Sequence, residues 1–266
     1  MKRDELRDYA ENEIQDINAK VSLLVYDFDQ DETLLSFHEK DRVVSASTIK
    51  TPILLTALDM VQSEKLSFGQ ILRLPGEEIL NDTEVFDRGV REYPLEELLT
   101  WIIINSDNTA TNVLIEFLGM DAVNAYCQRL GLKATVLERK MLDWEAIKQG
   151  LNNYTSAQDQ LTVFQSLRCA SILTPELCRY ALGILERQRD FSMALRYIAD
   201  RDFSAAHKTG GLNYLNHDTG IFSLPGHEYY FGCFVTDSTD DTDENPLSKK
   251  LIGRLSRKVY DYYKEG

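Results

Sequence analysis

The hydrophobic pattern divides the chain into stretches with different periods. A polar amphipathic helix is expected over residues 2–19. It precedes two apolar segments, 20–28 and 33–39, whose composition predicts strands joined by the turn DQDE. From residue 47 to about residue 200, apolar residues recur with the helical period instead. The chain therefore begins with a small strand unit and continues as a long helical block.

The C-terminal stretch returns to the strand pattern. Three apolar segments, SAAHKTGG, DTGIFSLPG and EYYFGCFVTDS, precede a helix that we expect from about residue 245 to 264. Strands near both ends of the chain thus flank the helical block. This order predicts an α+β fold, an αβα sandwich in which one antiparallel sheet is built from both chain ends, covered by the terminal helices, and carries an inserted helical domain.

Charge and composition limit the partners. The 266 residues include 29 Lys and Arg against 43 Asp and Glu, a net charge of −14. Such a surface repels phosphate backbones and anionic lipids, so we expect neither a nucleic acid nor a membrane as partner. The basic segment SKKLIGRLSRK fits the polar face of a helix whose apolar stripe is Leu251, Leu255 and Val259. We expect a monomer with no metal and no cofactor.

The N-terminal segment MKRDELRDYAENEIQ has no apolar signal region, and no apolar run of membrane-spanning length follows it. We therefore expect a cytoplasmic protein. Four cysteines are scattered without metal-ligand spacing, and we expect free, buried thiols at Cys127, Cys169, Cys178 and Cys233. The acidic turn DFDQDE is not a calcium loop, because Glu32 and His38 occupy the sixth and twelfth positions, where that loop needs Gly and Glu.

The first motif with candidate chemistry is Ser47-Thr48-Ile49-Lys50. Residues i and i+3 share one face of a helix, so a partly desolvated lysine could act as general base toward the serine hydroxyl. A nucleophile in the first turn also lies at the positive end of the helix dipole. By itself the motif fits an N-cap serine and a surface lysine as well, since S-x-x-K occurs by chance about once in a chain of this size.

Two further motifs have similar alternatives. SDN at 106–108 fits a helix cap, or a hydroxyl for proton relay and an amide for a substrate carbonyl. KTG at 208–210, followed by Gly211, is expected on an edge strand. It is not a phosphate loop, because His207 stands where that loop requires Gly. Alone, it also fits a surface lysine and a bend.

The order and spacing of the three motifs decide between these alternatives. S-x-x-K, then S-D-N about 60 residues on, then K-T-G about 100 further, is the signature of penicillin-interacting serine enzymes. The sequence resembles class A β-lactamases and, more broadly, the β-lactamase and D-alanyl-D-alanine peptidase superfamily, over nearly the whole chain. The resemblance implies a sheet subdomain (1–46 and 202–266), a helical subdomain (47–201), and an active site between them.

The resemblance also implies roles for the motif residues. Ser47 is the nucleophile that becomes acylated, and Lys50 is its proton partner. Ser106 passes a proton to the departing nitrogen. The main-chain N–H groups of Ser47 and Gly211 form the oxyanion hole, whose donors are typically worth about 10²–10³ in rate. Asp107 supports the loop.

Substrate binding is implied for a second group of residues. Asn108 hydrogen-bonds the side-chain amide of the substrate, and Lys208 and Thr209 receive its carboxylate. The strand after KTGG has no arginine to assist Lys208, and offers only His217 and His227. His217 is expected either to contribute to carboxylate binding or to be a turn residue before a strand.

One part of the family pattern is missing. The family carries a glutamate, in the pattern E-x-x-x-N, that activates the deacylating water. Aligning Leu137 and Arg139 with the family's L-x-R puts Met141 in the place of this glutamate and Glu145 in the place of the asparagine. Methionine cannot take a proton from water, so we expect slow deacylation unless Glu145, or failing that Asp143, reaches the water from a shifted position. Glu145 could equally be an exposed loop carboxylate.

Three functions therefore stay open. The first is a β-lactamase-like serine hydrolase with a Ser47 acyl-enzyme and slow release. The second is D-alanyl peptidase or esterase activity at the same site, which the missing glutamate favours and the expected cytoplasmic location disfavours. The third is a penicillin-binding protein or sensor whose acyl-enzyme persists, although no output domain is evident in the sequence.

Overall fold

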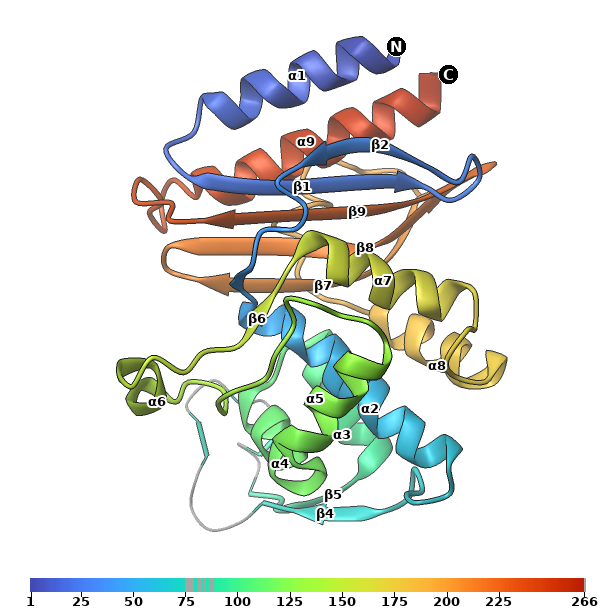
Figure 1. The fold of residues 1–266 in the computed structure, drawn as a ribbon, viewed down its shortest axis with the longest axis vertical. Helices are drawn as coiled ribbons and strands as arrows, with labels where there is room; N and C mark the ends of the chain where they lie inside the picture. The colour runs from blue at the N-terminus through green and yellow to red at the C-terminus, as the bar shows by residue number, and fades with distance from the viewer. Residues whose placement is uncertain (75–78, 81–82, 84, 87–88, 266) are drawn as a thin grey trace.

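The main strands form one antiparallel sheet drawn from both ends of the chain. The computed structural model describes residues 1–74, 79–80, 83, 85–86 and 89–265. The strand order is β2-β1-β9-β8-β7 in a five-stranded sheet, which confirms the predicted fold class (Figure 1). The strands are β1 (Lys20–Asp27), β2 (Glu32–Phe37), β7 (Ser204–Leu212), β8 (Leu215–Leu224) and β9 (His227–Thr236). β7, which carries the KTG motif, is an edge strand as expected.

Helices from both termini cover one face of the sheet. α1 (Arg3–Gln15) and α9 (Leu247–Glu265) pack against each other, and the two chain ends lie together at the top of the molecule (Figure 1). Leu251, Leu255 and Val259 are buried, as the helical pattern predicts. They share a core with sheet residues such as Leu23 and Phe231. Burial of each such side chain contributes about 1.5–3 kcal/mol, so this core anchors the sheet behind the site.

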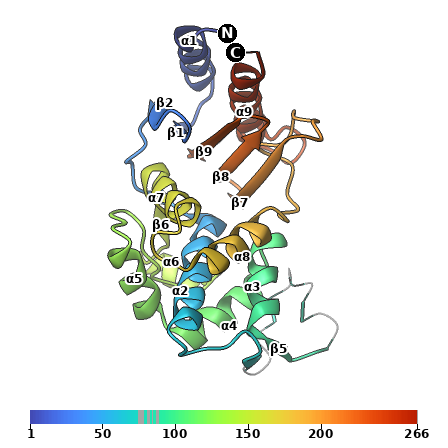
Figure 2. The ribbon, with the colours of Figure 1, turned by 90° about the vertical axis from the view of Figure 1, so that its right-hand side faces the viewer.

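The helical block lies on the opposite face (Figure 2). It consists of the 3₁₀ helix η1 (Ala46–Ile49), α2 (Lys50–Gln62), α3 (Leu95–Ile104), α4 (Asn108–Leu118), α5 (Met120–Arg129), α6 (Trp144–Lys148), α7 (Ala157–Arg168) and α8 (Pro175–Leu185). Two short ladders brace it, β3 (Val43–Val44) with β6 (Tyr154–Thr155) and β4 (Ile71–Arg73) with β5 (Glu92–Pro94). α2 is central: every residue from Lys50 to Leu58 is buried, as expected for a helix surrounded by others.

The prediction of four buried thiols is met at three of the four cysteines. Cys127, Cys178 and Cys233 are buried free thiols, but Cys169 is exposed, so the prediction of a buried thiol is wrong there. Cys169 follows the last residue of α7 as its C-cap, where the helix end is open to solvent. The division into two subdomains stays a prediction.

The acidic turn between β1 and β2 is a hairpin turn. The carboxylate of Asp27 accepts hydrogen bonds from the main-chain N–H groups of Asp29 and Gln30, both at 2.9 Å. Its second oxygen accepts from the hydroxyl of Tyr263 on α9, also at 2.9 Å. This carboxylate is therefore committed to shaping the turn and fixing α9 against the sheet.

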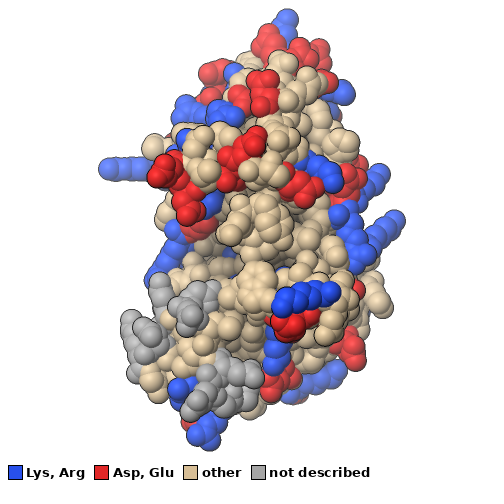
Figure 3. Space-filling view, turned by 90° about the vertical axis from the view of Figure 1, so that its left-hand side faces the viewer, with Lys and Arg blue, Asp and Glu red and all other residues tan. Residues whose placement is uncertain are grey.

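Charged side chains of both signs are mixed on the face shown in Figure 3. They gather over the upper part of that face, where the sheet and the terminal helices lie, and leave the middle of it mainly uncharged. None of the helices within the described residues is long and apolar enough to cross a membrane.

Candidate active site

Ser47 and Lys50 lie where β3 leads into the helical block. Ser47 belongs to η1 and Lys50 is the first residue of α2, so the α-helix begins three residues later than the motif suggested. Lys50 is fully buried, with 0% of its surface exposed, which excludes the alternative of a surface lysine. A buried amino group must be hydrogen-bonded, and its partners belong to the second motif.

Ser106 is where the three motifs meet. It lies in the short connection between α3 and α4 with φ of 56°. The Nζ of Lys50 donates to the Ser106 hydroxyl at 3.0 Å, to the Ser106 carbonyl at 2.5 Å and to the Oδ1 of Asn108 at 2.7 Å. The Nζ of Lys208 donates to the same hydroxyl at 3.1 Å. The Ser106 oxygen thus bridges two lysines, a geometry that allows a proton to pass between them.

Asp107 has a structural role in this connection. Its carboxylate accepts from the main-chain N–H of Ala110 at 2.7 Å and so caps α4. It also accepts from the hydroxyl of Thr83 at 2.7 Å. The helix-cap interpretation of the second motif is therefore correct for Asp107, while its neighbours Ser106 and Asn108 face the lysines.

Lys208 is buried in the edge strand β7 and has an unusual acidity. Burial lowers its pKa from 10.5 to about 7, although the charges of Asp190 and Asp218 counteract the shift. Besides Ser106, its Nζ donates to the carbonyl of Thr209 at 2.7 Å. A lysine of this kind can gain or lose its proton near neutral pH, so it can both bind an anion and exchange a proton with Ser106.

Gly210 allows β7 to lie directly against the nucleophile. A Cβ atom at this position would lie 3.0 Å from the main-chain N of Ser47 and 3.2 Å from both the Cβ of Ala46 and the carbonyl O of Ser45. Only glycine permits so close an approach without displacing its neighbours. The KTG motif and the nucleophile are thereby brought together across the boundary between sheet and helices.

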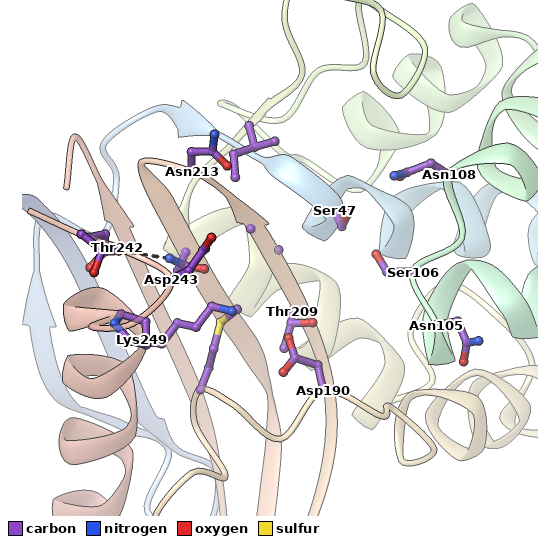
Figure 4. A pocket seen from close by; sticks show the side chains of 17 residues that line it. Ser47, Asn105, Ser106, Asn108, Asp190, Thr209, Asn213, Thr242, Asp243 and Lys249 are labelled. Atoms are coloured by element: carbon purple, nitrogen blue, oxygen red, sulfur yellow. Dashed lines mark hydrogen bonds between the residues drawn. The ribbon is translucent and has the colours of Figure 1, made fainter. Parts of the chain in front are cut away.

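A cavity of about 790 Å³ opens beside these residues. Ser47, Ser106 and Asn108 lie on its helical side, and Thr209 and Gly211 on its sheet side (Figure 4). This volume suits a ligand of drug-like size, since such pockets usually span about 300–1,000 Å³. The candidate nucleophile is therefore accessible to a small molecule.

Four charged residues that line the cavity were missed by the sequence reasoning: Asp190, Asp241, Asp243 and Lys249. Lys249, near the start of α9, and Asp190 both line it (Figure 4). Burial raises the pKa of Asp190, but hydrogen bonds from Ser192 and the charges of Lys249 and Lys208 outweigh it and leave the pKa below its usual value. Lys249 belongs to the basic segment SKKLIGRLSRK, whose place at the cavity only the tertiary fold reveals.

Met141 is held next to the α4 helix. Its main-chain N donates to the Oδ1 of Asn112 at 2.6 Å, and its carbonyl accepts from the Nδ2 of Asn112 at 3.1 Å. Asn112 lies one helical turn after Asn108, so Met141 is anchored close to the cavity. Its side chain is buried in the apolar core, and a thioether is too weak an acceptor to take a proton from water.

Glu145 does not point to the site. Its side chain is 76% exposed, and its carboxylate pairs with Lys148 at 2.6 Å within α6. Asp143 caps the same short helix by accepting from the N–H of Ala146 at 3.0 Å. The prediction that Glu145 or Asp143 replaces the missing base is contradicted by these positions, because the local helix α6 directs both side chains to their own partners. Glu145 is an exposed carboxylate on α6, away from the site.

His217 is neither a turn residue nor a carboxylate ligand. β8 begins at Leu215, earlier than the pattern suggested, and His217 is fully buried within that strand. Its Nε2 lies 2.8 Å from the carbonyl O of Val44. Burial lowers its pKa to about 4, so it carries no charge at neutral pH for an anion to bind. Both expectations for His217 are wrong, and His227 packs instead on Tyr263 with ring centroids 5.2 Å apart.

Comparison with known proteins identifies the family. The model of the Beta-lactamase enzyme family matches residues 4–263. This chain belongs to that family. The match includes both halves of the sheet, the helical block and all three motifs. Membership supports a hydrolase that acts on β-lactams.

Individual relatives are distant in sequence and close in structure. A beta-lactamase of Bacteroides uniformis is 22% identical over 86% of this chain and 81% of that protein. The beta-lactamase from Chitinophaga pinensis has a TM-score of 0.89 at 21% identity, covering 97% of this chain and 99% of that one. A mutant of PBP-A, solved as an acyl-enzyme complex with penicillin G, has a TM-score of 0.86 at 25% identity, covering 99% and 96%. These structures confirm the fold.

Proposed function

We propose that this member of the Beta-lactamase enzyme family is a serine hydrolase that β-lactams acylate on Ser47, and that its acyl-enzyme is released slowly. The observation that carries the proposal is the pair of hydrogen bonds from Lys50 and Lys208 to the Ser106 hydroxyl, at 3.0 and 3.1 Å, beside a cavity that Ser47 lines. This arrangement places a base and a proton relay in one polar network, next to a cavity that the nucleophile lines.

Acylation follows from this arrangement. The Ser47 hydroxyl attacks the lactam carbonyl carbon while its proton passes to the neutral amine form of Lys50, and the developing oxyanion is bound by the N–H groups of Ser47 and Gly211. When the carbon–nitrogen bond breaks, the nitrogen takes a proton from the Ser106 hydroxyl, which is replenished by a lysine hydrogen-bonded to it. The product is an ester on Ser47 that retains every atom of the β-lactam.

Binding of the substrate uses the sheet side of the cavity. Thr209 receives the carboxylate at the cavity wall, the buried Lys208 supplies positive charge from behind it, and Lys249 is a cation that lines the cavity itself. An anion beside Lys208 favours its protonated form, so binding itself charges this lysine. Asn108 donates from Nδ2 to the amide carbonyl of the substrate, since its Oδ1 already accepts from Lys50.

Release of the ester needs a base that activates water. Met141 occupies the position where the family has its glutamate, and Glu145 is exposed and paired with Lys148. Neither Glu145 nor Asp143, which caps α6, therefore supplies the carboxylate for this step. We infer that the acyl-enzyme accumulates, and that hydrolysis is slower than acylation.

The replacement of the family's glutamate by Met141 favours a second candidate function, D-alanyl peptidase or esterase activity at the same site. Such an enzyme passes its acyl group to water or an amine without the glutamate. It would release D-alanine from a peptide ending in D-alanyl-D-alanine, whereas the first function would not.

Steady-state turnover of nitrocefin and release of D-alanine test these functions together. We expect measurable but slow nitrocefin opening by the wild type, none by Ser47→Ala, and no D-alanine release. Absence of both reactions in the wild type, with no covalent adduct after incubation with benzylpenicillin, would refute the proposed function.

A further inference from the structure

The segment that leads into Ser47 has a backbone conformation that its surroundings must impose. Ala46 has φ of 45°, in the left-handed region that residues other than glycine adopt only when surrounding contacts over-determine it. One such contact is the hydrogen bond from the N of Ser45 to the carbonyl of Asn153, at 2.9 Å. The conformation of this segment decides where the Ser47 N–H and hydroxyl point.

A second contact comes from the sheet. His217 on β8 lies opposite Gly210 on β7 in the strand register, and because Gly210 has no side chain, the imidazole reaches past it to the carbonyl of Val44. Its ring is fixed by Phe234 of β9, with centroids 4.9 Å apart. At the same place Gly210 lies against the main-chain N of Ser47. The neighbouring residues Gly210 and His217 of the sheet therefore together contact the segment 44–47.

The chemistry of this hydrogen bond is fixed by its acceptor. A carbonyl oxygen only accepts, so the Nε2 of His217 carries the proton. Full burial keeps the imidazole neutral at neutral pH, since its pKa is lowered to about 4. The donor is thus constant over the pH range in which Lys208 changes charge.

We propose that His217 is a positioning residue for the nucleophile: its hydrogen bond to the Val44 carbonyl holds residues 44–47 against β7, so that Ser47 keeps its attack geometry and its oxyanion-hole N–H. This inference rests on the proposed acylation of Ser47. Its effect lies in the chemical step and not in substrate binding, because His217 does not line the cavity.

Two substitutions separate the hydrogen bond from the bulk of the ring. In His217→Gln the donor nitrogen is three bonds beyond Cβ, as in histidine, so the contact can be kept. In His217→Leu no donor remains. We expect His217→Leu to lower the acylation rate constant at saturating β-lactam about 10- to 100-fold, with the dissociation constant within about threefold of wild type, and His217→Gln to restore most of the rate.

Tyr230→Phe is the matched control. The Tyr230 hydroxyl, on the neighbouring strand β9, donates to the carbonyl of Ala157 at 2.9 Å. Tyr230 is as fully buried as His217. Neither Tyr230 nor Ala157 lines the cavity. This variant loses a buried donor to a carbonyl, as His217→Leu does. We expect it to lose comparable thermal stability and to keep wild-type acylation.

The experiment measures acylation by stopped-flow with a chromogenic β-lactam, alongside thermal unfolding of each variant. Wild-type acylation by His217→Leu, equal loss in His217→Leu and His217→Gln, or an equal loss in Tyr230→Phe would each overturn the inference. If His217→Leu does not fold, His217→Asn replaces it. The amide nitrogen of asparagine is one bond nearer to Cβ than Nε2 of histidine, so it does not reach the Val44 carbonyl. The same criteria then apply. A wild type that forms no adduct refutes the proposed function, and this inference with it.

Discussion

A methyl group at position 210 has no room between β7 and η1. In Gly210→Ala the new Cβ would lie 3.0 Å from the Ser47 N and 3.2 Å from the Ala46 Cβ and the Ser45 carbonyl O. Non-bonded carbon atoms are most favourable at about 3.5–4.0 Å, so the methyl group is too close to these neighbours by about 0.3–1 Å. Overpacking of this kind usually costs about 1–3 kcal/mol of unfolding free energy.

We expect the substitution at position 210 to displace Ser47. β7 is held along its length by β8, whereas η1 is a single short turn, so we expect η1 to move. A shift of Ser47 disturbs the attack geometry and the oxyanion hole together, and a misplacement of about 1 Å typically costs about 10²-fold in rate. We therefore expect Gly210→Ala to acylate about 100-fold more slowly than the wild type, with a free energy of unfolding about 1–3 kcal/mol lower.

Stopped-flow acylation and urea unfolding measure both effects. Gly183→Ala is the control, because a Cβ at Gly183 in α8 meets no atom within 4 Å. This variant should acylate normally and gain about 0.5–1 kcal/mol, as glycine is a poor helix former. The reasoning is refuted if Gly210→Ala acylates within about threefold of the wild type, since the close contact would then have no consequence for Ser47.

Three further predictions concern the chemistry of the site. Met141→Glu should raise nitrocefin turnover about 10-fold or more, because burial raises the pKa of the new carboxyl toward the range of a general base; unchanged turnover would show that the side chain does not reach the water. The pKa of Lys208 is about 7, so its protonated fraction falls from about 0.9 at pH 6 to about 0.1 at pH 8. Binding of a carboxylate-bearing β-lactam, measured as the apparent dissociation constant for acylation, should weaken from pH 6 to pH 8. Lys208→Arg should make this constant independent of pH. A wild-type constant that does not change with pH would contradict the role of Lys208 in binding the carboxylate. Lys249→Met should weaken binding of the same β-lactam about 3- to 10-fold at low salt with no change in the acylation rate constant; a change in the rate constant alone would contradict a role in binding.

The sequence was informative where local pattern and motif spacing suffice. The apolar segments predicted β1, β2, β7, β8 and β9, and the buried positions of α9 followed the helical period. The three motifs predicted that Ser47, Ser106 and Lys208 come together, and the hydrogen bonds of Ser106 bring the lysines of two motifs to one hydroxyl. Such spacing is specific because each motif is short but their joint order is rare.

The remaining features depend on contacts between distant segments. Whether His217 faces a turn or the buried face of β8 depends on where the β7–β8 hairpin begins, and its partner Val44 is far away in the chain. Lys249 could be assigned to the cavity only once α9 is packed beside β8 and β9. Glu145 was assigned by register, but the short helix α6 turns its side chain to Lys148.

Time-resolved intact-mass spectrometry with benzylpenicillin tests the central claim most directly. The wild type should gain the mass of one whole penicillin on the peptide that contains Ser47, and this adduct should persist after free penicillin is removed. Ser47→Ala should gain none. A wild type that hydrolyses penicillin without accumulating an adduct, or that carries the adduct on another peptide, would contradict slow release from an acylated Ser47.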